Sequence, residues 1–377
     1  MRRFEFKDVR SNKFWEVTRS DNILTVRFGR IGAEGQEKST KFPSPEVAYK
    51  EQEKLIAEKL RKGYKEVAVS GASDGEAPVI TPPPPSGIIG ALRRCEPLKR
   101  VARQLESIQR VSLRITTTAH KKTSEGINRF GGRPDFPPGI SWPIGKVAGR
   151  EIALPFIAQF DAAWLWRTYG GPGTIGLLPP TGMLYFFYNM ADYGADYLAP
   201  ENWRVIYHKE RNLDTLVPAE PPLPIPPHLD YKPRTLTFAT EMTLPNVETS
   251  YIGGPGNSDA KVELTDEEWN AYVNLRNELR ANQNIHQMFG HADDVQPYAL
   301  ENSYGSTRDV FFPDGRPFRG LTPKEQNEEF FQGRLLLQVD EEKDSGMQFG
   351  RGGRLFFFIR EQDLKTRDFS KVWVNEQ

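Results

Sequence analysis

The chain has 377 residues, too many for one ordinary hydrophobic core, and this length predicts two or three domains. Its composition, with 38% hydrophobic and 27% charged residues, excludes an intrinsically disordered protein. The net charge is zero, which excludes a protein that coats nucleic acid along its whole length. However, residues 1–69 hold 16 Lys and Arg against 11 Asp and Glu, a net charge of +5, and the remainder carries −5. We therefore expect the N-terminal part to contact a polyanion.

Cys95 is the single cysteine, so the chain cannot form an intrachain disulfide, and we expect a reducing compartment. The first residues lack the apolar core of a secretory signal. No apolar run approaches the roughly 20 residues needed to span a bilayer. These features predict a cytoplasmic protein with no membrane partner.

Residues 1–67 predict a small α+β unit. Short strand-like runs, such as Phe14 to Val17 and Ile23 to Phe28, are separated by polar turn residues. Ser44-Pro45-Glu46 is typical of a helix start, and Gly63 of a helix end. The helix between them runs to about residue 61 and packs on one face of the strands.

This region also contains a motif. Residues 28–36 read Phe-Gly-Arg-Ile-Gly-Ala-Glu-Gly-Gln, and the two strand-like runs precede them. Together they resemble the WGR domain, with Phe28 where the family name has Trp. In poly(ADP-ribose) polymerases that domain helps to hold broken DNA, and the resemblance implies contact with DNA or another nucleic acid. Phe28 would pack on a sugar, while Arg30 and Asn12 would contact phosphate. The alternative is that Phe28 is a core residue and Arg30 a surface salt-bridge partner.

Residues 70–87 are rich in Gly, Ser and Pro, including four consecutive prolines, and predict a linker between domains. The second domain is then expected over residues 88–377. It opens with a helical stretch that contains Leu98, Val101 and Leu105.

An internal similarity follows within the second domain. Gln159-x-Asp161 precedes an aromatic strand at residues 183–188, and Gln338-x-Asp340 precedes a similar strand at residues 354–359. We interpret this echo as a duplication within a larger, antiparallel-sheet-rich α+β domain.

Dispersed motifs between residues 125 and 375 carry a second resemblance. They include the stretch from Phe130 to Gly139, the run Leu154 to Gln159, and the segment Leu335 to Asp340. These stretches look like the bacterial YwqG-like family, a domain of unknown function, so the resemblance implies a fold and no chemistry. Members often have Trp-Gly-Asp before the last strand, where this chain has Phe349-Gly350-Arg351. A role for that acidic residue therefore does not transfer.

Paired carboxylates are the main catalytic candidates. Asp161 and Asp340 could approach each other across a pseudo-dyad and act as an acid/base pair. The favoured alternative is that both cap turns after strands and fix the interface between the repeats. The histidines at 286 and 291, beside Asp293 and Asp294, do not have the spacing of a zinc helix, so we predict no metal and no cofactor.

The sequence thus predicts a non-enzymatic protein that binds nucleic acid or a partner through residues 1–69, with a large domain of unknown role. Two alternatives stay open. One is an enzyme whose site lies between the repeats, and the other is a protein-interaction scaffold.

Overall fold

The computed structural model describes residues 2–7, 12–20, 22–31, 35–43, 45–67, 86–121, 127–147, 149–170, 174–190, 200–210, 212–247, 249–256, 260–280, 285–296, 299–300, 303, 321–350 and 352–377. The chain divides into two compact units, Met1–Pro78 and Val79–Gln377. The segment expected as a linker, residues 70–87, lies outside the described residues except for Ser86 and Gly87, which begin helix α2 (Ser86–Arg94).

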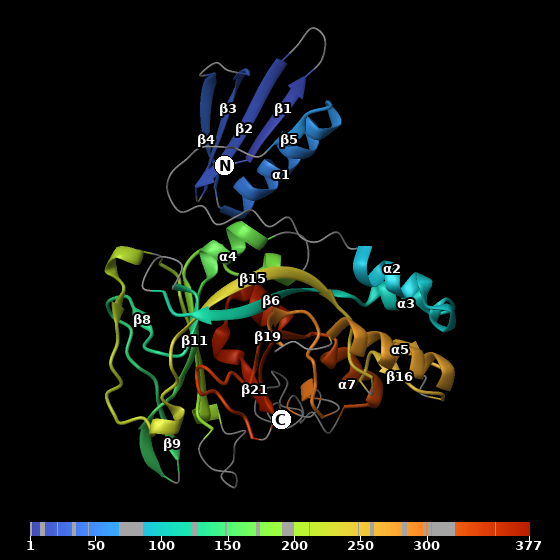
Figure 1. Cartoon of the computed structure of the whole chain (residues 1–377). Helices are drawn as coiled ribbons and strands as arrows, with labels where there is room; N and C mark the ends of the chain where they lie inside the picture. The colour runs from blue at the N-terminus through green and yellow to red at the C-terminus, as the bar shows by residue number, and fades with distance from the viewer. Residues whose placement is uncertain are drawn as a thin grey trace. The chain divides into compact units, whose positions relative to one another are not determined.

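The first unit is an antiparallel sheet with one helix (Figure 1). Its elements are β1 (Arg2–Lys7), β2 (Asn12–Ser20), β3 (Ile23–Arg30), β4 (Gln36–Lys41), α1 (Pro45–Arg61) and β5 (Lys65–Val67), with the strand order β4-β3-β2-β1-β5. Helix α1 buries Ile56 against Trp15, Val17 and Leu24 of the sheet. Gly63, with φ +83°, follows the helix in a conformation that residues with a Cβ rarely adopt. The sequence therefore forms the sheet and helix that its pattern predicts.

The second unit is built on a sheet of ten antiparallel strands. These are β6 (Arg110–Ala119), β7 (Arg129–Phe130), β11 (Phe156–Asp161), β12 (Met183–Tyr188), β13 (Trp203–His208), β15 (Arg234–Thr243), β18 (His286–Phe289), β19 (Gly333–Asp340), β20 (Arg354–Arg360) and β21 (Trp373–Glu376). Their order is β13-β12-β11-β7-β15-β6-β18-β19-β20-β21. Both units combine helices with antiparallel sheets, so the predicted α+β class is confirmed.

The second unit also contains helices and short strand pairs. The helices are α2, α3 (Ala102–Ser107), α4 (Ala162–Tyr169), α5 (Asp266–Arg280), α7 (Pro323–Phe330) and α8 (Glu361–Thr366). The strand pairs are β8 (Asp135–Phe136) with β14 (Val217–Pro218), β9 (Ile144–Val147) with β10 (Arg150–Ala153), and β16 (Ile252–Gly253) with β17 (Val262–Glu263). Among the described residues, no helix has the length and apolar character that crossing a bilayer requires.

The order of the large sheet is symmetric about its central pair, β15 and β6. We call β7, β11, β12 and β13 the first half, and β18, β19, β20 and β21 the second half. The central strands are exchanged between the halves. Strand β6 comes before the first half in the sequence but pairs with β18, and β15 comes before the second half but pairs with β7. Each half therefore depends on a strand that the other part of the chain supplies.

The two halves also repeat the same register. Strand β11 pairs with β12 and shifts register between Phe156 and Ala158, and β19 pairs with β20 and shifts between Leu335 and Leu337. Each of these positions in the second half lies 179 residues after its counterpart in the first. Phe186 of β12 packs edge-on against Phe357 of β20, with 5.1 Å between ring centroids. The halves therefore share one aromatic core.

Candidate functional sites

Phe28 is an exposed ring on the first unit. Its side chain is 42% exposed, although its neighbour across the strands, Trp15, is buried. Side chains alternate along a strand, so Phe28 and Arg30 lie on one face of β3. Arg30 is also exposed, and no carboxylate of the described residues pairs with it. Phe28 is therefore not a core residue, and the structure gives Arg30 no salt bridge within the described part of the unit.

Further cations lie on the same face of the sheet. Lys13 lies opposite Arg30 in the β2–β3 register, and Lys38 lies opposite Val26 on the same face of the edge strand β4. The ammonium of Lys59 lies 5.4 Å from the centroid of the Trp15 ring. Burial lowers the pKa of Lys59, and the positive charges of Lys62 and Lys13 act in the same direction. This face of the unit thus combines an exposed ring with several cations.

On the opposite face of the same sheet, charged side chains form ion pairs with one another. Burial opposes the ionisation of Glu16, but hydrogen bonds from Arg27 and Arg3 hold its pKa below the ordinary value. Arg27 Nε lies 2.7 Å and Arg3 Nη1 2.6 Å from the Glu16 carboxylate. The Arg3 guanidinium also lies 4.5 Å from the centroid of the Phe14 ring. Arg27 and Arg30 belong to one strand, yet only Arg30 is free of such a carboxylate among the described residues.

Two other motif residues have different places. Asn12 is exposed at the start of β2, and strand alternation puts its side chain on the opposite face from Lys13, so it is not beside Phe28. A Cβ on Gly29 would lie 2.8 Å from the Cα of Gly35. Gly29 therefore lets the β3–β4 connection approach closely.

In the second unit, Gln159 clamps the segment around β7. Its Oε1 accepts from the Asp135 backbone N–H at 2.7 Å, and its Nε2 donates to the Ile127 carbonyl at 2.9 Å. The segment between these contacts turns at Gly131 and Gly132, with φ of 59° and 74°. Gln159 is completely buried, so both ends of its amide need such partners.

Gln338 clamps the segment around β18 in the same way. Its Oε1 accepts from the Asp293 N–H at 2.9 Å, and its Nε2 donates to the Ile285 carbonyl at 2.7 Å. This segment turns at Phe289 and Gly290, with φ of 61° and 77°. Each of the clamped positions lies 158 residues after its counterpart in the first half. The repeated Gln is therefore a structural clamp in both halves.

The two carboxylates of the Gln-x-Asp motifs are also engaged locally. Asp161 is the N-cap of α4 and accepts from the Trp164 N–H at 2.9 Å. Asp340 accepts from the Ile285 N–H at 3.0 Å, and its Oδ1 lies 3.4 Å from Arg354 Nε. Strands β7, β15, β6 and β18 lie between β11 and β19 in the sheet. The sheet order therefore does not place Asp161 and Asp340 on neighbouring strands.

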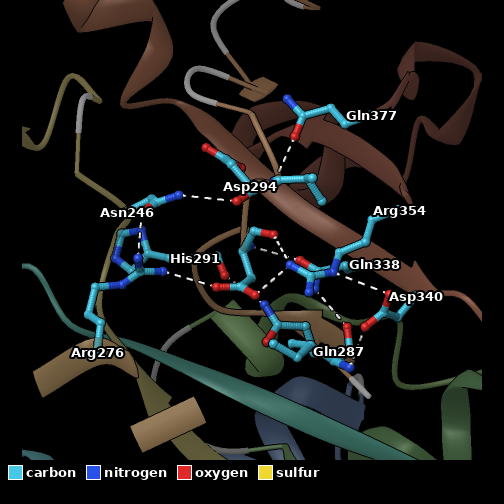
Figure 2. A network of polar contacts seen from close by, with 12 residues as sticks. Asn246, Arg276, Gln287, His291, Asp294, Gln338, Asp340, Arg354 and Gln377 are labelled. Carbon is cyan, nitrogen blue, oxygen red and sulfur yellow. Dashed lines mark hydrogen bonds and ion pairs between the residues drawn. The ribbon is translucent and has the colours of Figure 1, made fainter. Parts of the chain in front are cut away.

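Figure 2 shows the polar network around the second clamp. The Asp293 carboxylate lies 3.0 Å from Arg276 Nη2 and 2.6 Å from Arg354 Nη1. Arg276 donates in addition to the side chain of Asn246, whose Nδ2 donates to the Asp294 carbonyl at 3.2 Å. Asp293 thus ties helix α5, strand β20 and the segment after β18 to one another.

The two histidines have separate partners. His286 Nδ1 accepts from the Asp340 N–H at 3.0 Å, and its Nε2 lies 3.6 Å from the Glu342 carboxylate. His291 Nε2 lies 2.7 Å from the Ile108 carbonyl, so it donates there. Within the described ranges, no group of three or more His, Cys, Asp or Glu side chains could hold a metal ion.

Sequence reasoning missed the other end of each clamp. Gly132-x-x-Asp135 and Gly290-x-x-Asp293 are a second matching pair of motifs, and their shared Gly-x-x-Asp spacing is the signal that could have revealed them. The exchange of β6 and β15 has no such signal, because strand pairing over long sequence distances leaves no local pattern.

Comparison with known proteins follows the division into two units. The WGR domain family matches residues 1–70, and the Domain of unknown function (DUF1963) family matches residues 128–377. These matches confirm both resemblances seen in the sequence.

Similar proteins include three that share short stretches with this chain. The chain is 40% identical over 65 residues to the uncharacterized protein YfeS of Escherichia coli strain K12, which is 17% of this chain and 27% of that protein. It is 41% identical over 68 residues to protein YehF of the same strain, 18% of this chain and 25% of that protein. The chain thus spans about a quarter of the length of either relative. A crystal structure of a Bacteroides fragilis protein is 40% identical over 18% of this chain and 19% of that chain, with a TM-score of 0.18.

Since the DUF1963 match covers well over half of the chain, the protein belongs to the DUF1963 family and carries a WGR domain at residues 1–70.

Proposed function

We propose that the WGR domain binds nucleic acid, DNA ends in particular, on the face that presents Phe28 and Arg30. The observation that carries the proposal is the 42% exposure of Phe28 on a face with Lys13 and Arg30. An apolar ring exposed among cations has no role in the core of this unit. The same combination suits a base or sugar next to a phosphate.

Each residue has a distinct part in this proposal. The Phe28 ring stacks on the sugar or base, and the Arg30 guanidinium donates to phosphate oxygens in a charge-assisted fork. Asn12 contacts a phosphate only where the nucleic acid passes the end of the strands, because its side chain lies on the other face. Its substitution should therefore weaken binding less than that of Arg30.

We further propose that the second unit is non-enzymatic, arose by duplication, and acts in the cytoplasm with the WGR domain. The repeated register and clamps support the duplication, and the single cysteine supports the location. The local partners of Asp161 and Asp340 support structural roles rather than acid/base catalysis. Recruitment of a protein partner is the alternative role for the WGR face.

The test is titration of fluorescently labelled duplexes with the full chain, using blunt, overhanging and 5′-phosphorylated ends. Affinity should fall as salt rises, because phosphate contacts release counterions. Arg30→Ala should weaken binding and reduce the slope of log K against log salt by about 1. Lys50→Ala is the matched control, since Lys50 is an exposed cation on α1 in the turns that precede Lys59.

Phe28→Ala should weaken binding by about 1–3 kcal/mol if the ring stacks on nucleic acid. Phe28→Trp restores the aromatic residue of the family name and should bind at least as tightly as the wild type. Because Phe28 is exposed, both variants should keep the wild-type circular dichroism spectrum. If the folded wild-type protein shows no saturable binding at low salt, the protein-partner alternative replaces this proposal.

A further inference from the structure

The second half of the large unit contains a pocket. Its cavity volume is about 40 Å³, within about 410 Å³ of non-atom space that includes open solvent, and its lining includes Arg110, Asn246, Tyr251, His291, Leu335 and Phe358. These residues come from the start of β6, the segment after β15, the turn after β18, and strands β19 and β20. The pocket thus combines apolar walls from the sheet with polar groups from its rim.

Arg110 is the cation of this pocket. Its guanidinium donates to the Tyr251 hydroxyl and, at 3.4 Å, to the Gly333 carbonyl, and it lies 5.1 Å from the centroid of the Tyr251 ring. Burial lowers the pKa of Arg110 to about 10, so the group is still charged at neutral pH. No carboxylate of the described residues pairs with it. A buried guanidinium with two neutral acceptors lacks the anion that would offset its desolvation.

The neighbouring charges do not supply that anion. The Lys261 ammonium lies 5.2 Å from the Tyr251 ring and 3.8 Å from the Phe331 ring. Burial lowers the pKa of Lys261, and the positive charges of Arg110 and Arg334 add to this effect. The Glu361 carboxylate acts on the pKa of Arg110 in the opposite direction to burial, but it pairs with Arg334 and with Lys365. Glu361 is therefore shared between two other cations and forms no ion pair with Arg110 among the described residues.

We propose that this pocket binds a small organic carboxylate, whose oxygens accept from Arg110 and whose carbon body packs on Leu335 and Phe358. A planar carboxylate matches the guanidinium fork. Asp294, which also lines the pocket, disfavours the higher charge of a phosphate dianion. The apolar walls favour an anion that carries carbon over a bare inorganic ion.

The proposal is tested on the full chain with butyrate and benzoate as probes. Butyramide and benzamide serve as neutral probes of the same shape, and inorganic phosphate as the competing oxyanion. Calorimetry and saturation-transfer NMR should show that each acid binds at least tenfold more tightly than its amide and than phosphate. Amides that bind as tightly as the acids, or phosphate that binds more tightly, would overturn the assignment, as would no binding of either acid at 50 mM.

Variants connect the binding to Arg110. Arg110→Gln should weaken the binding of benzoate at least tenfold, whereas Arg110→Lys should keep part of it. Arg103→Gln, the same change at an exposed position on α3, should leave binding unaltered. If Arg110→Gln does not fold, Ala292→Leu is the decisive variant, because it fills the pocket without removing a charge. Full benzoate binding by folded Ala292→Leu, or by folded Arg110→Gln, contradicts the proposal.

Discussion

The two halves of the large sheet have the same strand register but differ in how side chains pack beside it. In the first half, Phe187 packs against Phe156 and Trp142, with 5.4 and 5.5 Å between ring centroids. The strand register makes Leu335 and Phe358 the counterparts of Phe156 and Phe187 in the second half. There the same two positions line the pocket beside Arg110. One frame therefore supports a packed aromatic cluster in one half and an open pocket in the other.

One change in side-chain size accompanies this difference. The offset of 158 residues that relates the clamped segments carries Trp142 to Leu300, which lines the pocket with a much smaller side chain. The Gln clamps, in contrast, are the same in both halves. The clamp therefore fixes the backbone in both halves, while residues outside the clamp decide whether the space beside the paired strands is filled by side chains.

The largest expected effect comes from removing the centre of the second clamp. Asp293→Ala leaves Arg276 and Arg354 without their shared carboxylate, and both guanidinium groups are mostly buried. We expect a loss of about 3–5 kcal/mol in the free energy of unfolding, measured by urea titration. The counterpart change, Asp135→Ala, removes the carboxylate partner of one guanidinium, Arg129, and an acceptor of Gln159 Nε2, and it should have a smaller effect. A loss below about 1 kcal/mol for Asp293→Ala would show that the network is not a stabilising clamp.

The second expected effect tests the difference between the packed aromatic cluster of the first half and the pocket of the second half. Trp142→Leu gives the first half the smaller residue of the second half, and we expect it to lower the free energy of unfolding by about 2–4 kcal/mol through a new cavity. The reverse change, Leu300→Trp, should fill existing space, cost less than about 1.5 kcal/mol, and abolish benzoate binding. Equal losses for the two variants would show that both sites are packed alike.

Local patterns predicted much of the fold. The Ser-Pro-Glu start and the Gly63 stop define α1, and the Gln-x-Asp echo marks two strand pairs whose registers match. These signals work because capping and strand alternation depend on neighbours in the sequence. The shared face of Phe28 and Arg30 also follows from one strand. The exposure of Phe28 does not, because the sequence left a core position open, and the cations Lys38 and Lys59 on this face come from other elements.

The pocket could not be predicted in this way. Arg110 reaches it from the start of β6, which pairs with β18 of the second half. Its contact with Tyr251 joins positions 141 residues apart in the sequence. A lone Arg before a strand gives no sign of such a partner, since long-range pairing decides where it lies. From the sequence, Asn12 is expected to contact phosphate together with Arg30. Because side chains alternate along a strand, Asn12 lies on the opposite face of the sheet from its neighbour Lys13.

The third expected effect tests whether the two clamps are equivalent. Gln159→Ala and Gln338→Ala each leave a buried backbone N–H and a carbonyl without their partner. Each should lower the free energy of unfolding by about 1–3 kcal/mol. The double variant should equal the sum within about 0.5 kcal/mol, since the clamps share no partner. Gln362→Ala, at an exposed position on α8, is the control with no expected loss. A large loss at one clamp only would break the structural equivalence.

The smallest expected effect is a pH dependence of the free energy of unfolding that arises in the second half alone. His286, 3.6 Å away, and the Thr117 hydroxyl, at 2.6 Å, hold the pKa of Glu342 at about 2, although burial acts in the other direction. The counterpart of Glu342 in the first half, 179 residues earlier, is the buried Ala163. Because the folded pKa lies below the ordinary value of 4.5, the ionised carboxylate stabilises the fold above about pH 4.5. This stabilisation is lost as the pH falls from about 4.5 toward 2.

Urea titrations between pH 6 and pH 3 of the wild type and of Glu342→Gln measure the contribution of ionised Glu342 to the free energy of unfolding. We expect the variant to be less stable by on the order of 1–2 kcal/mol at pH 6, because the imidazole lies beyond hydrogen-bond distance and contributes only part of the shift. The difference should shrink as the pH falls, since protonation removes the charge from the wild type as well. Asp344→Asn is the matched control, because its carboxylate, 64% exposed, pairs with Arg234 at the surface. A difference between Glu342→Gln and the wild type that stays constant from pH 6 to pH 3 would show that the ionised form of Glu342 does not stabilise the second half.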